Sequence, residues 1–249
     1  MKRETTHGYA YLPGVMQYSA GVVSMPGYEL VRVQFLDCLP MEQGFAHIED
    51  HLKGLGLPLT AFCACEMRSP KPFSEVGFYD FNKLYADVLR EWGVMKGDDN
   101  PIARSNVCPI DNPPQNPSFY AFTYAVPKPN AIGGDFVVAG SGEAPEGTGD
   151  YAGNAICPGR TDPDAIAQKA RFVLDVMAAR LNGLGQTWDR VVTAQMYTVH
   201  DPYHVFKNEP DMQRARKQGL TWHLAHPPVN GLEFEMDCRN VSCELVSKG

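Results

Sequence analysis

The stretch LKGLGLPLTAFCACEM, residues 52–67, decides the fold because the chain repeats it. The stretch LNGLGQTWDRVVTAQM, residues 181–196, aligns with it without a gap at an offset of 129 positions. Leu, Gly, Leu, Gly and the final Met coincide in the two copies. This period is much longer than the roughly 20–50 residues of a solenoid unit. The sequence therefore predicts two homologous domains in one chain.

The residues around each copy repeat as well. Apolar residues at helical spacing precede both copies and predict helices over residues 45–55 and 173–181. Asp162 and Pro163 are typical of a helix start, and each Gly-Leu-Gly is typical of a helix end. A run rich in strand-forming residues follows each helix. Each copy is therefore expected to contain a helix followed by a strand.

Each half continues with a more polar helix and then two strands. The predicted helices cover 78–93 and 204–219, and the predicted strand pairs cover 103–110 with 118–127 and 220–226 with 232–246. Turn-rich segments separate the strands. We interpret residues 1–126 as the first domain, 127–135 as a linker and 136–249 as the second domain.

The fold class that follows is α/β, with each half an α+β sheet that carries both helices on one face. The helices cover only one face of each sheet. The other face requires a second sheet or a subunit to cover it. Burial alone therefore predicts a homo-oligomer.

Composition narrows the class of partner. The chain has 249 residues, 44% of them hydrophobic and 20% charged, so it is expected to bury a core. Its net charge of −7 argues against nucleic acid or an anionic membrane as a partner, but allows a small anionic substrate beside a local arginine. Seven cysteines without a C-x-x-C motif favour free thiols in a reducing compartment. No N-terminal segment reads as a signal peptide and no apolar run is long enough to span a membrane, so we expect a cytoplasmic protein.

Arg104 stands out within NPIARSNVCP, residues 100–109, because no acidic residue lies near it in this segment. A guanidinium in a strand is costly to bury unless a partner compensates its charge. One interpretation is an ion pair with a carboxylate elsewhere in the protein. The interpretation we favour is a planar clamp for the carboxylate of a substrate.

Both halves resemble the RidA/YjgF family. The first half shows FNKLYADVLREWG and IARSNV, and the second shows FVVAGSGEAP, GLGQTWDRVVTAQMYTVHD and PPVNGLEFEMDCRNV. The order of these motifs, in two copies, carries the resemblance over most of the chain. It implies tandem chorismate-mutase-like domains that form an oligomeric barrel, as a trimer, with sites between neighbouring domains. It also implies hydrolysis of imines and enamines with release of ammonia.

The resemblance assigns roles to particular residues. Arg104 matches the arginine that binds the substrate carboxylate, and Glu233 matches the glutamate that orients water. Asn82 and the Ser141-Gly142 turn match the groups near the substrate nitrogen. Cys108 lies four residues after Arg104 and is expected to line the same pocket. Glu235 and Asp237 are the alternatives to Glu233.

The site residues are divided between the halves. The first half has Tyr120 or Ala121 where the glutamate is expected. The second half has Gln218, or its neighbours Arg216 and Lys217, where the arginine is expected. Complementary losses of this kind predict one composite site where the two kinds of domain meet.

Other motifs give no competing function. His47 and His51 have a spacing that can hold zinc, but they lack the H-E-x-x-H order and a third ligand, as do the pairs His200 with His204 and His223 with His226. The glycine-rich AGSGEAPEGTG has neither a P-loop nor a dinucleotide pattern. We therefore expect no metal and no cofactor.

The function predicted from the sequence is a hydrolytic deaminase of 2-imino or 2-amino-unsaturated carboxylic acids. Its substrate is expected to be small, such as 2-aminoacrylate, or larger, such as 2-aminomuconate from aromatic catabolism. Two alternatives remain open. One is a non-catalytic protein of the same fold that binds or senses a small acid, and the other is a chorismatase-like hydrolase. A ribonuclease is disfavoured because the chain is acidic and has no basic stripe with aromatic residues.

Overall fold

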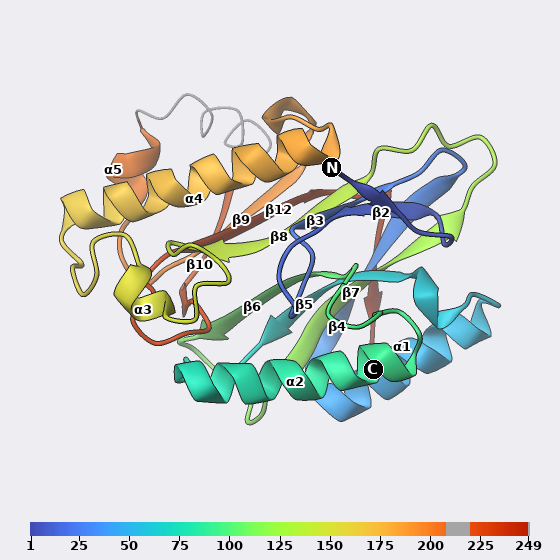
Figure 1. Ribbon diagram of the computed structural model, residues 1–249, viewed down its shortest axis with the longest axis horizontal. Coiled ribbons are helices and arrows are strands. Elements are labelled where there is room, and N and C mark those ends of the chain that lie inside the picture. The colour runs from blue at the N-terminus through green and yellow to red at the C-terminus, as the bar shows by residue number, and fades with distance from the viewer. Residues whose placement is uncertain (208–219, 249) are drawn as a thin grey trace.

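A computed structural model describes residues 1–207 and 220–248 of the chain (Figure 1). The described helices are α1 (Met41–Gly54), α2 (Glu75–Glu91), α3 (Tyr151–Asn154), α4 (Pro163–Leu184) and α5 (Tyr203–Phe206). The described strands are β1 (Arg3–Glu4), β2 (Tyr9–Leu12), β3 (Gly21–Ser24), β4 (Tyr28–Pro40), β5 (Phe62–Arg68), β6 (Ala103–Pro109), β7 (Ser118–Pro127), β8 (Phe136–Gly142), β9 (Thr193–Tyr197), β10 (Leu220–His223), β11 (Ala225–His226), β12 (Glu235–Asn240) and β13 (Cys243–Ser247). The mixed α and β class predicted from the sequence is confirmed.

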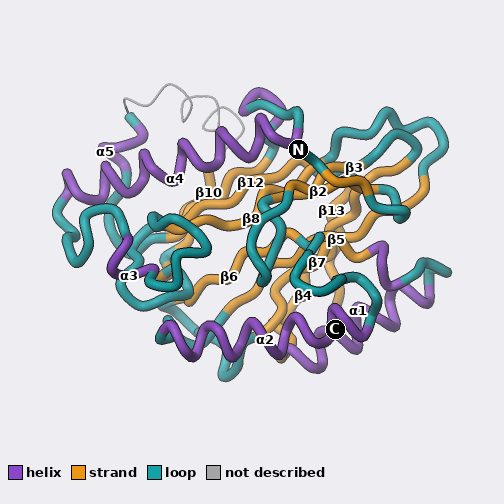
Figure 2. Tube along the Cα trace, in the orientation of Figure 1, coloured by secondary structure: helices purple, strands orange, loops and turns teal. Residues whose placement is uncertain are grey.

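The described strands form two sheets, which face each other at the centre of the molecule. We call the sheet with the order β11-β6-β5-β7-β4-β13 the N-sheet, because its central strands come from the first half. The C-sheet has the order β1-β2-β3-β8-β12-β9-β10. Helices α1 and α2 cover the outer face of the N-sheet, and α4 covers the outer face of the C-sheet (Figures 1 and 2). Within one chain the two sheets stay separate and do not close into a barrel.

The internal repeat is visible in the structure. Two short 3-10 helices, Leu59–Ala61 and Trp188–Arg190, occur at the offset of 129 positions, and β5 and β9 end at equivalent residues. Helix α4, which belongs to the second copy, begins as predicted. The Asp162 side chain accepts a hydrogen bond from the Ala165 amide, and Pro163 lies in the first turn. The helix ends at Gly185, whose left-handed conformation (φ 76°) suits glycine. The predicted helix–strand unit is therefore confirmed in both copies.

The two halves exchange strands. The N-terminal strands β1 to β3 extend the C-sheet, because β3 pairs with β8. The last strand, β13, pairs in parallel with β4 at the edge of the N-sheet. The predicted strand 232–246 is therefore two strands in different sheets. The predicted strand 220–226 also divides, since β10 pairs with β9 and β11 pairs with β6. The alternating pattern identified strand residues but carried no information about which sheet each would join.

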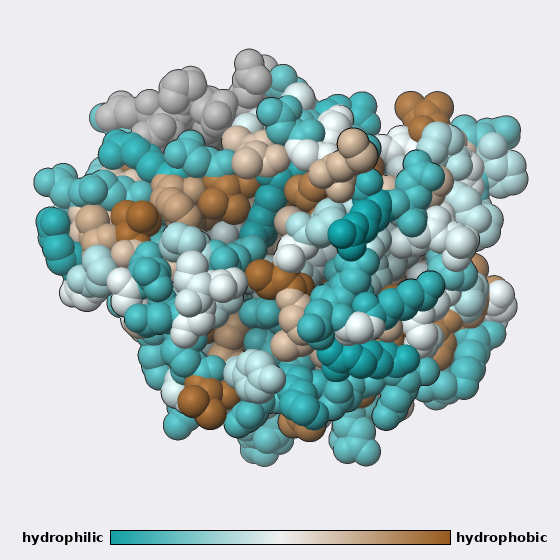
Figure 3. Space-filling model, viewed as in Figure 1, coloured by the Kyte–Doolittle hydropathy of each residue, from teal (hydrophilic) through white to brown (hydrophobic). Residues whose placement is uncertain are grey.

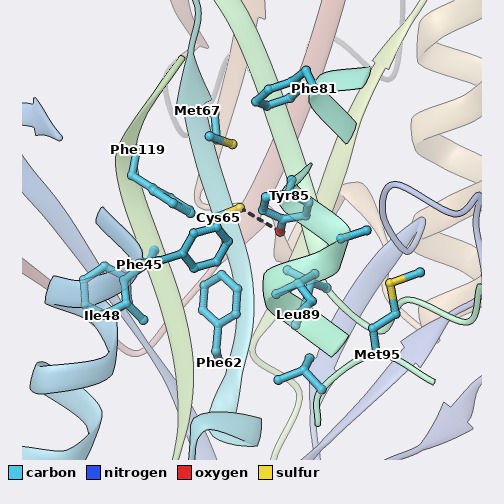
Figure 4. Packing of buried hydrophobic residues seen from close by; sticks show 14 of the residues in the cluster. Phe45, Ile48, Phe62, Cys65, Met67, Phe81, Tyr85, Leu89, Met95 and Phe119 are labelled. Atoms are coloured by element: carbon cyan, nitrogen blue, oxygen red, sulfur yellow. Dashed lines mark hydrogen bonds between the residues drawn. The ribbon is translucent and has the colours of Figure 1, made fainter. Parts of the chain in front are cut away.

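A core of aromatic and aliphatic side chains fills the space between the N-sheet and its helices (Figure 4). Phe45 of α1 contacts Phe119 of β7 edge-on, and Tyr85 of α2 lies beside Cys65 of β5 with its hydroxyl 3.4 Å from the sulfur. A second core packs α4 against the C-sheet. The two cores hold α2 and β12 in place, and β6 is held by its parallel pairing with β5. These three elements carry the site described below.

The surface matches the composition of the chain. On the face shown in Figure 3, hydrophobic side chains form small groups among hydrophilic residues. Within residues 1–207 and 220–248, no helix has the length and apolarity needed to cross a membrane.

Candidate active site

Arg104 is buried without a carboxylate partner among the described residues. It lies on β6, opposite Cys65 of β5, and is 2% exposed. Its Nη2 donates a hydrogen bond to Asn82 Oδ1 at 2.5 Å. The guanidinium also lies over three rings, those of Tyr85 at 4.6 Å, Phe81 at 5.3 Å and Tyr18 at 5.5 Å. Its Nη1 finds no acceptor in the described part of the chain. The structural ion pair considered from the sequence is therefore absent from the described residues.

Arg104 opens into a cavity lined by both halves of the chain. The lining residues are Tyr18, Phe78, Arg104, Asn106, Gly140, Gly142, Ala144, Glu146, Tyr151, Pro228, Val229, Leu232 and Glu235. Asn106 contributes a second buried donor, because its amide nitrogen has no acceptor among the described residues while its oxygen accepts a bond from Ser69. Two unsatisfied buried donors in one cavity are costly unless a ligand supplies the acceptors.

Glu235 is the carboxyl group of this cavity. It is 4% exposed and pairs in register with Gly142 of β8. Burial, followed by the charges of Asp237, Glu146 and Glu143, raises the pKa of Glu235 well above its usual value. These surroundings favour the protonated form of the Glu235 carboxyl group, which shares the cavity with the guanidinium of Arg104.

Glu233 does not line the cavity. Its Oε2 lies 2.9 Å from His200 Nε2, and its backbone amide donates to Glu143 Oε1. Both glutamates fall within the predicted strand 232–246, where alternation would put them on one face, but β12 begins only at Glu235. Because Glu233 precedes the strand, the alternation does not apply to it. The structure thus brings the alternative, Glu235, to Arg104 in place of Glu233.

Some of the other predicted site residues lie at the cavity, and others do not. Asn82 contacts Arg104 and acts through it. Gly142 lines the cavity, whereas the buried Ser141 lies opposite Met236 and its hydroxyl bonds only the carbonyl of Gly142. Cys108 is buried opposite His226 and is absent from the lining, and burial raises the pKa of its thiol to about 12. A thiol in this state is a poor nucleophile.

Asp237, the other alternative to Glu233, belongs to a network between the sheets. It accepts hydrogen bonds from Ser105 at 2.6 Å and from Gln195 and Tyr197 at 2.9 Å. The Ser105 bond joins the strand that carries Arg104 to the strand that carries Glu235. Asp237 therefore holds the two halves of the site together without lining the cavity.

The strand register identifies the repeat counterparts of Arg104 and Glu235. Cys65 pairs with Arg104, and its counterpart Ala194, 129 positions later, pairs with Leu220. Leu220 therefore occupies the arginine position of the second half. Gln218, Arg216 and Lys217, to which the sequence analysis assigned this position, lie outside the described residues.

The glutamate position of the first half is also corrected. Tyr197 pairs with Glu235, and its counterpart Arg68 pairs with Ser118. Ser118 therefore takes the place that the sequence analysis gave to Tyr120 or Ala121, because a shift in register along β7 displaces the alignment. The counterpart site, which would combine the arginine position of the second half with the glutamate position of the first half, therefore carries Leu220 and Ser118. The cavity described above carries Arg104 and Glu235 at the same two positions.

The histidine pairs do not form a metal centre in the described parts of the chain, where no three His, Cys, Asp or Glu side chains are grouped to hold an ion. His47 contacts Ser247, His204 contacts the Pro163 carbonyl and His223 contacts Gln195.

The cavity residues that the sequence analysis did not identify include Tyr18, Asn106 and Glu146. Asn106 lies two residues after Arg104 in the same motif, and this spacing is the signal that could have identified it. Tyr18 and Glu146 come from connecting segments, where no periodicity marks a side chain.

The packing at Gly140 gives a prediction about the acid. A methyl group at this position would lie 2.3 Å from Glu235 Oε1 and 3.2 Å from the Cα of Ser105. The Gly140→Ala variant must therefore displace the Glu235 carboxyl. We expect kcat to fall about 100-fold, since misplacement by about 1 Å has effects of this order. Steady-state kinetics check this, and Gly54→Ala, where an added methyl meets open space, is the matched control.

Comparison with known proteins identifies the family. The chain matches the family model described as 2-aminomuconate deaminase CnbZ over residues 1–245. It is 42% identical over 240 residues, which are 96% of each chain, to a 2-amino-5-chloromuconate deaminase of Comamonas testosteroni. The protein is therefore related to enzymes of the deaminase class. It belongs to the 2-aminomuconate deaminase CnbZ family, as the 2-aminomuconate-type interpretation of the sequence anticipated.

Solved structures with local similarity include RidA/YjgF proteins. The Escherichia coli YjgF product is 15% identical, with a TM-score of 0.33 over 45% of this chain and 84% of that chain. A chorismatase is 12% identical, with a TM-score of 0.45 over 95% of this chain and 76% of that chain.

Proposed function

We propose that the protein is a hydrolytic deaminase of 2-amino-unsaturated or 2-imino carboxylic acids, with substrates of the 2-aminomuconate type. The observation that carries this proposal is the cavity between the halves. It holds a buried guanidinium with a free donor and a buried carboxyl group whose pKa is raised by burial and by neighbouring acids. The first fits a carboxylate, and the second fits a group that must gain a proton as it leaves.

The carboxylate end of the substrate binds at Arg104 and Asn106. Arg104 Nη1 and the Asn106 amide nitrogen are the two unsatisfied donors, so a carboxylate with two oxygens satisfies both. Asn82 fixes the guanidinium by accepting from Nη2. The apolar side chains of Phe78, Leu232 and Val229 then contact the carbon chain.

The nitrogen end lies toward Glu235. Water adds to the C=N carbon of the iminium form and releases one proton to a base, and the π electrons move to nitrogen to give a carbinolamine. Glu235 donates its proton to that nitrogen, which turns the amine into a leaving group. The carbinol then gives its O–H proton back to the Glu235 carboxylate as the C–N bond breaks, and the products are a 2-keto acid and ammonia. An iminium is already electrophilic, so positioning and proton transfer are sufficient for this chemistry.

The test is ammonia release from a series of 2-amino-unsaturated acids, with and without the carboxylate adjacent to the nitrogen-bearing carbon. We expect turnover only when that carboxylate is present. Calorimetric binding of the same acids without ammonia release would instead support the non-catalytic interpretation.

We also propose that the protein is a homotrimer. The edge strand β13 carries the exposed Leu245 and Val246, with the exposed Leu36 on the neighbouring β4. The opposite sheet ends at β10, where Trp222 is 46% exposed. Apolar residues at open sheet edges favour a covered interface.

Light scattering at micromolar concentration is therefore expected to give the mass of a trimer. The double variant Leu36→Lys, Val246→Lys should dissociate it, because two charges would be buried in the interface. Ile132→Lys, an exposed position in the linker, is the matched control. A monomeric wild-type protein would contradict the proposal.

A further inference from the structure

A second carboxyl group, that of Glu146, lines the same cavity as Glu235. Glu146 lies in the segment between β8 and α3. Its Oε1 receives two hydrogen bonds, one from Arg180 Nη2 at 2.5 Å and one from the Tyr18 hydroxyl at 3.0 Å. Both bonds end on Oε1, and Oε2 has no hydrogen bond with another described residue. One oxygen is therefore anchored while the other stays available to a molecule in the cavity.

Arg180, which binds Glu146 Oε1, is itself held in place by the backbone. Arg180 extends from α4, and its side chain is 6% exposed. Its Nη1 donates to the carbonyl oxygens of Ala139 at 2.9 Å and Gly140 at 3.2 Å. Gly140 is also the residue against which the Glu235 carboxyl packs. Arg180 therefore fixes Glu146 relative to the strand that borders Glu235.

The two carboxyl groups of the cavity have opposite surroundings. Glu235 has no ion-pair partner among the described residues. Burial, followed by the charges of Asp237, Glu146 and Glu143, raises its pKa, and the charge of Arg180 opposes them without outweighing them. Glu146 pairs with the guanidinium of Arg180. The other titratable groups that face Glu146 are Tyr18, from the segment before β3, and Tyr151 of α3. A carboxylate held by a guanidinium and a buried carboxyl group without such a partner are suited to divide the base and acid roles.

We propose that Glu146 is a second catalytic carboxylate, which accepts the proton of the attacking water while Glu235 protonates the departing nitrogen. This inference rests on the proposed function. It also assigns the nitrogen end of the substrate to the space between the two acids, so the preferred substrate is one whose nitrogen is cationic.

The proton transfers balance over one turnover. Water forms the C–O bond and gives one proton to Glu146, while the C=N π electrons pass to nitrogen. Glu235 gives its proton to that nitrogen. The carbinol O–H proton then returns to Glu235 as the carbonyl forms and ammonia leaves. Ammonia takes the proton held by Glu146 and departs as ammonium, which restores both acids to their starting states.

The test compares Glu146→Gln and Glu146→Ala with the wild-type enzyme. If Glu146 is the base, kcat of Glu146→Gln should fall about 100-fold or more with little change in KM, within the range of general base catalysis. Formate or acetate should restore activity to Glu146→Ala in a saturable manner. Glu91→Gln, at an exposed position on α2, controls for loss of one negative charge.

The outcomes separate this inference from the proposed function. A wild-type enzyme that releases no ammonia from any acid in the series overturns both. An active wild-type enzyme whose Glu146→Gln variant keeps the wild-type kcat overturns the role of Glu146 alone. The same holds if Glu146→Ala is not rescued, or if the effect lies only in KM, as expected when Glu146 merely holds Tyr18. Circular dichroism melts confirm that each variant is folded.

Discussion

Replacing Arg104 with alanine is expected to remove most of the activity and leave the protein folded. The guanidinium has one free donor and lies in the cavity beside a second free donor on Asn106. Loss of a charge-assisted pair with a substrate carboxylate costs about 2–4 kcal/mol of transition-state stabilisation, or about 30- to 1,000-fold in kcat/KM. The measurement is kcat/KM for ammonia release, with a thermal melt of each variant.

Two further variants make this result specific. Arg104→Lys keeps the charge but loses the planar fork, so it should recover only part of the activity. Leu220→Met changes the repeat counterpart of Arg104 and should have a small effect, because Leu220 does not line the cavity. Equal damage from the Leu220 and Arg104 substitutions, with both proteins folded, would place the site between a different pair of domains.

The sequence contained enough to predict the repeat, because helix ends and apolar periodicity are local properties. Gly185 and Asp162 take the positions that helix capping requires. The pairing of strands was not predictable in the same way. Nothing in residues 232–246 signals that β12 joins one sheet and β13 the other, since that choice depends on contacts with β8 and β4 far away in the chain.

The candidate site, too, was predictable where the signal is local and not where it depends on tertiary contacts. Arg104 was identified because it stands in a predicted strand without an acidic neighbour in sequence, and Asn82 because it matches the motif of a similar family. Glu233 was preferred to Glu235 because the same motif match selected it, and a pattern with period two does not reveal where the strand begins. Glu146 carried no local signal, because a loop residue is brought to the cavity by tertiary contacts with Arg180 and Tyr18.

Glu235→Gln is expected to lower kcat about 100- to 10,000-fold, because it removes a general acid while preserving shape. KM should change little, since Arg104 and Asn106 bind the carboxylate. Wild-type activity should fall at high pH as the Glu235 proton is lost, and this alkaline limb should be absent from the variant. The measurement is the pH dependence of kcat for both enzymes, with Ser118→Ala, the counterpart position of the first half, as control.

The protonation of Glu235 also has a consequence for stability that does not depend on any substrate. Its pKa is raised in the folded protein, whereas in the unfolded chain it returns to about its usual value of 4.5. Below pH 4.5 the Glu235 carboxyl is protonated in both states, and its contribution to stability is fully present. As the pH rises from 4.5 toward the folded pKa, the unfolded state loses the proton first, so this contribution falls by up to about 1.4 kcal/mol per pH unit. Glutamine does not ionise, so the melting temperature of Glu235→Gln should gain on that of the wild type between pH 4.5 and neutral pH. A constant difference across this range would mean that Glu235 is already ionised in the folded protein, and the proton donor would then have to be another group.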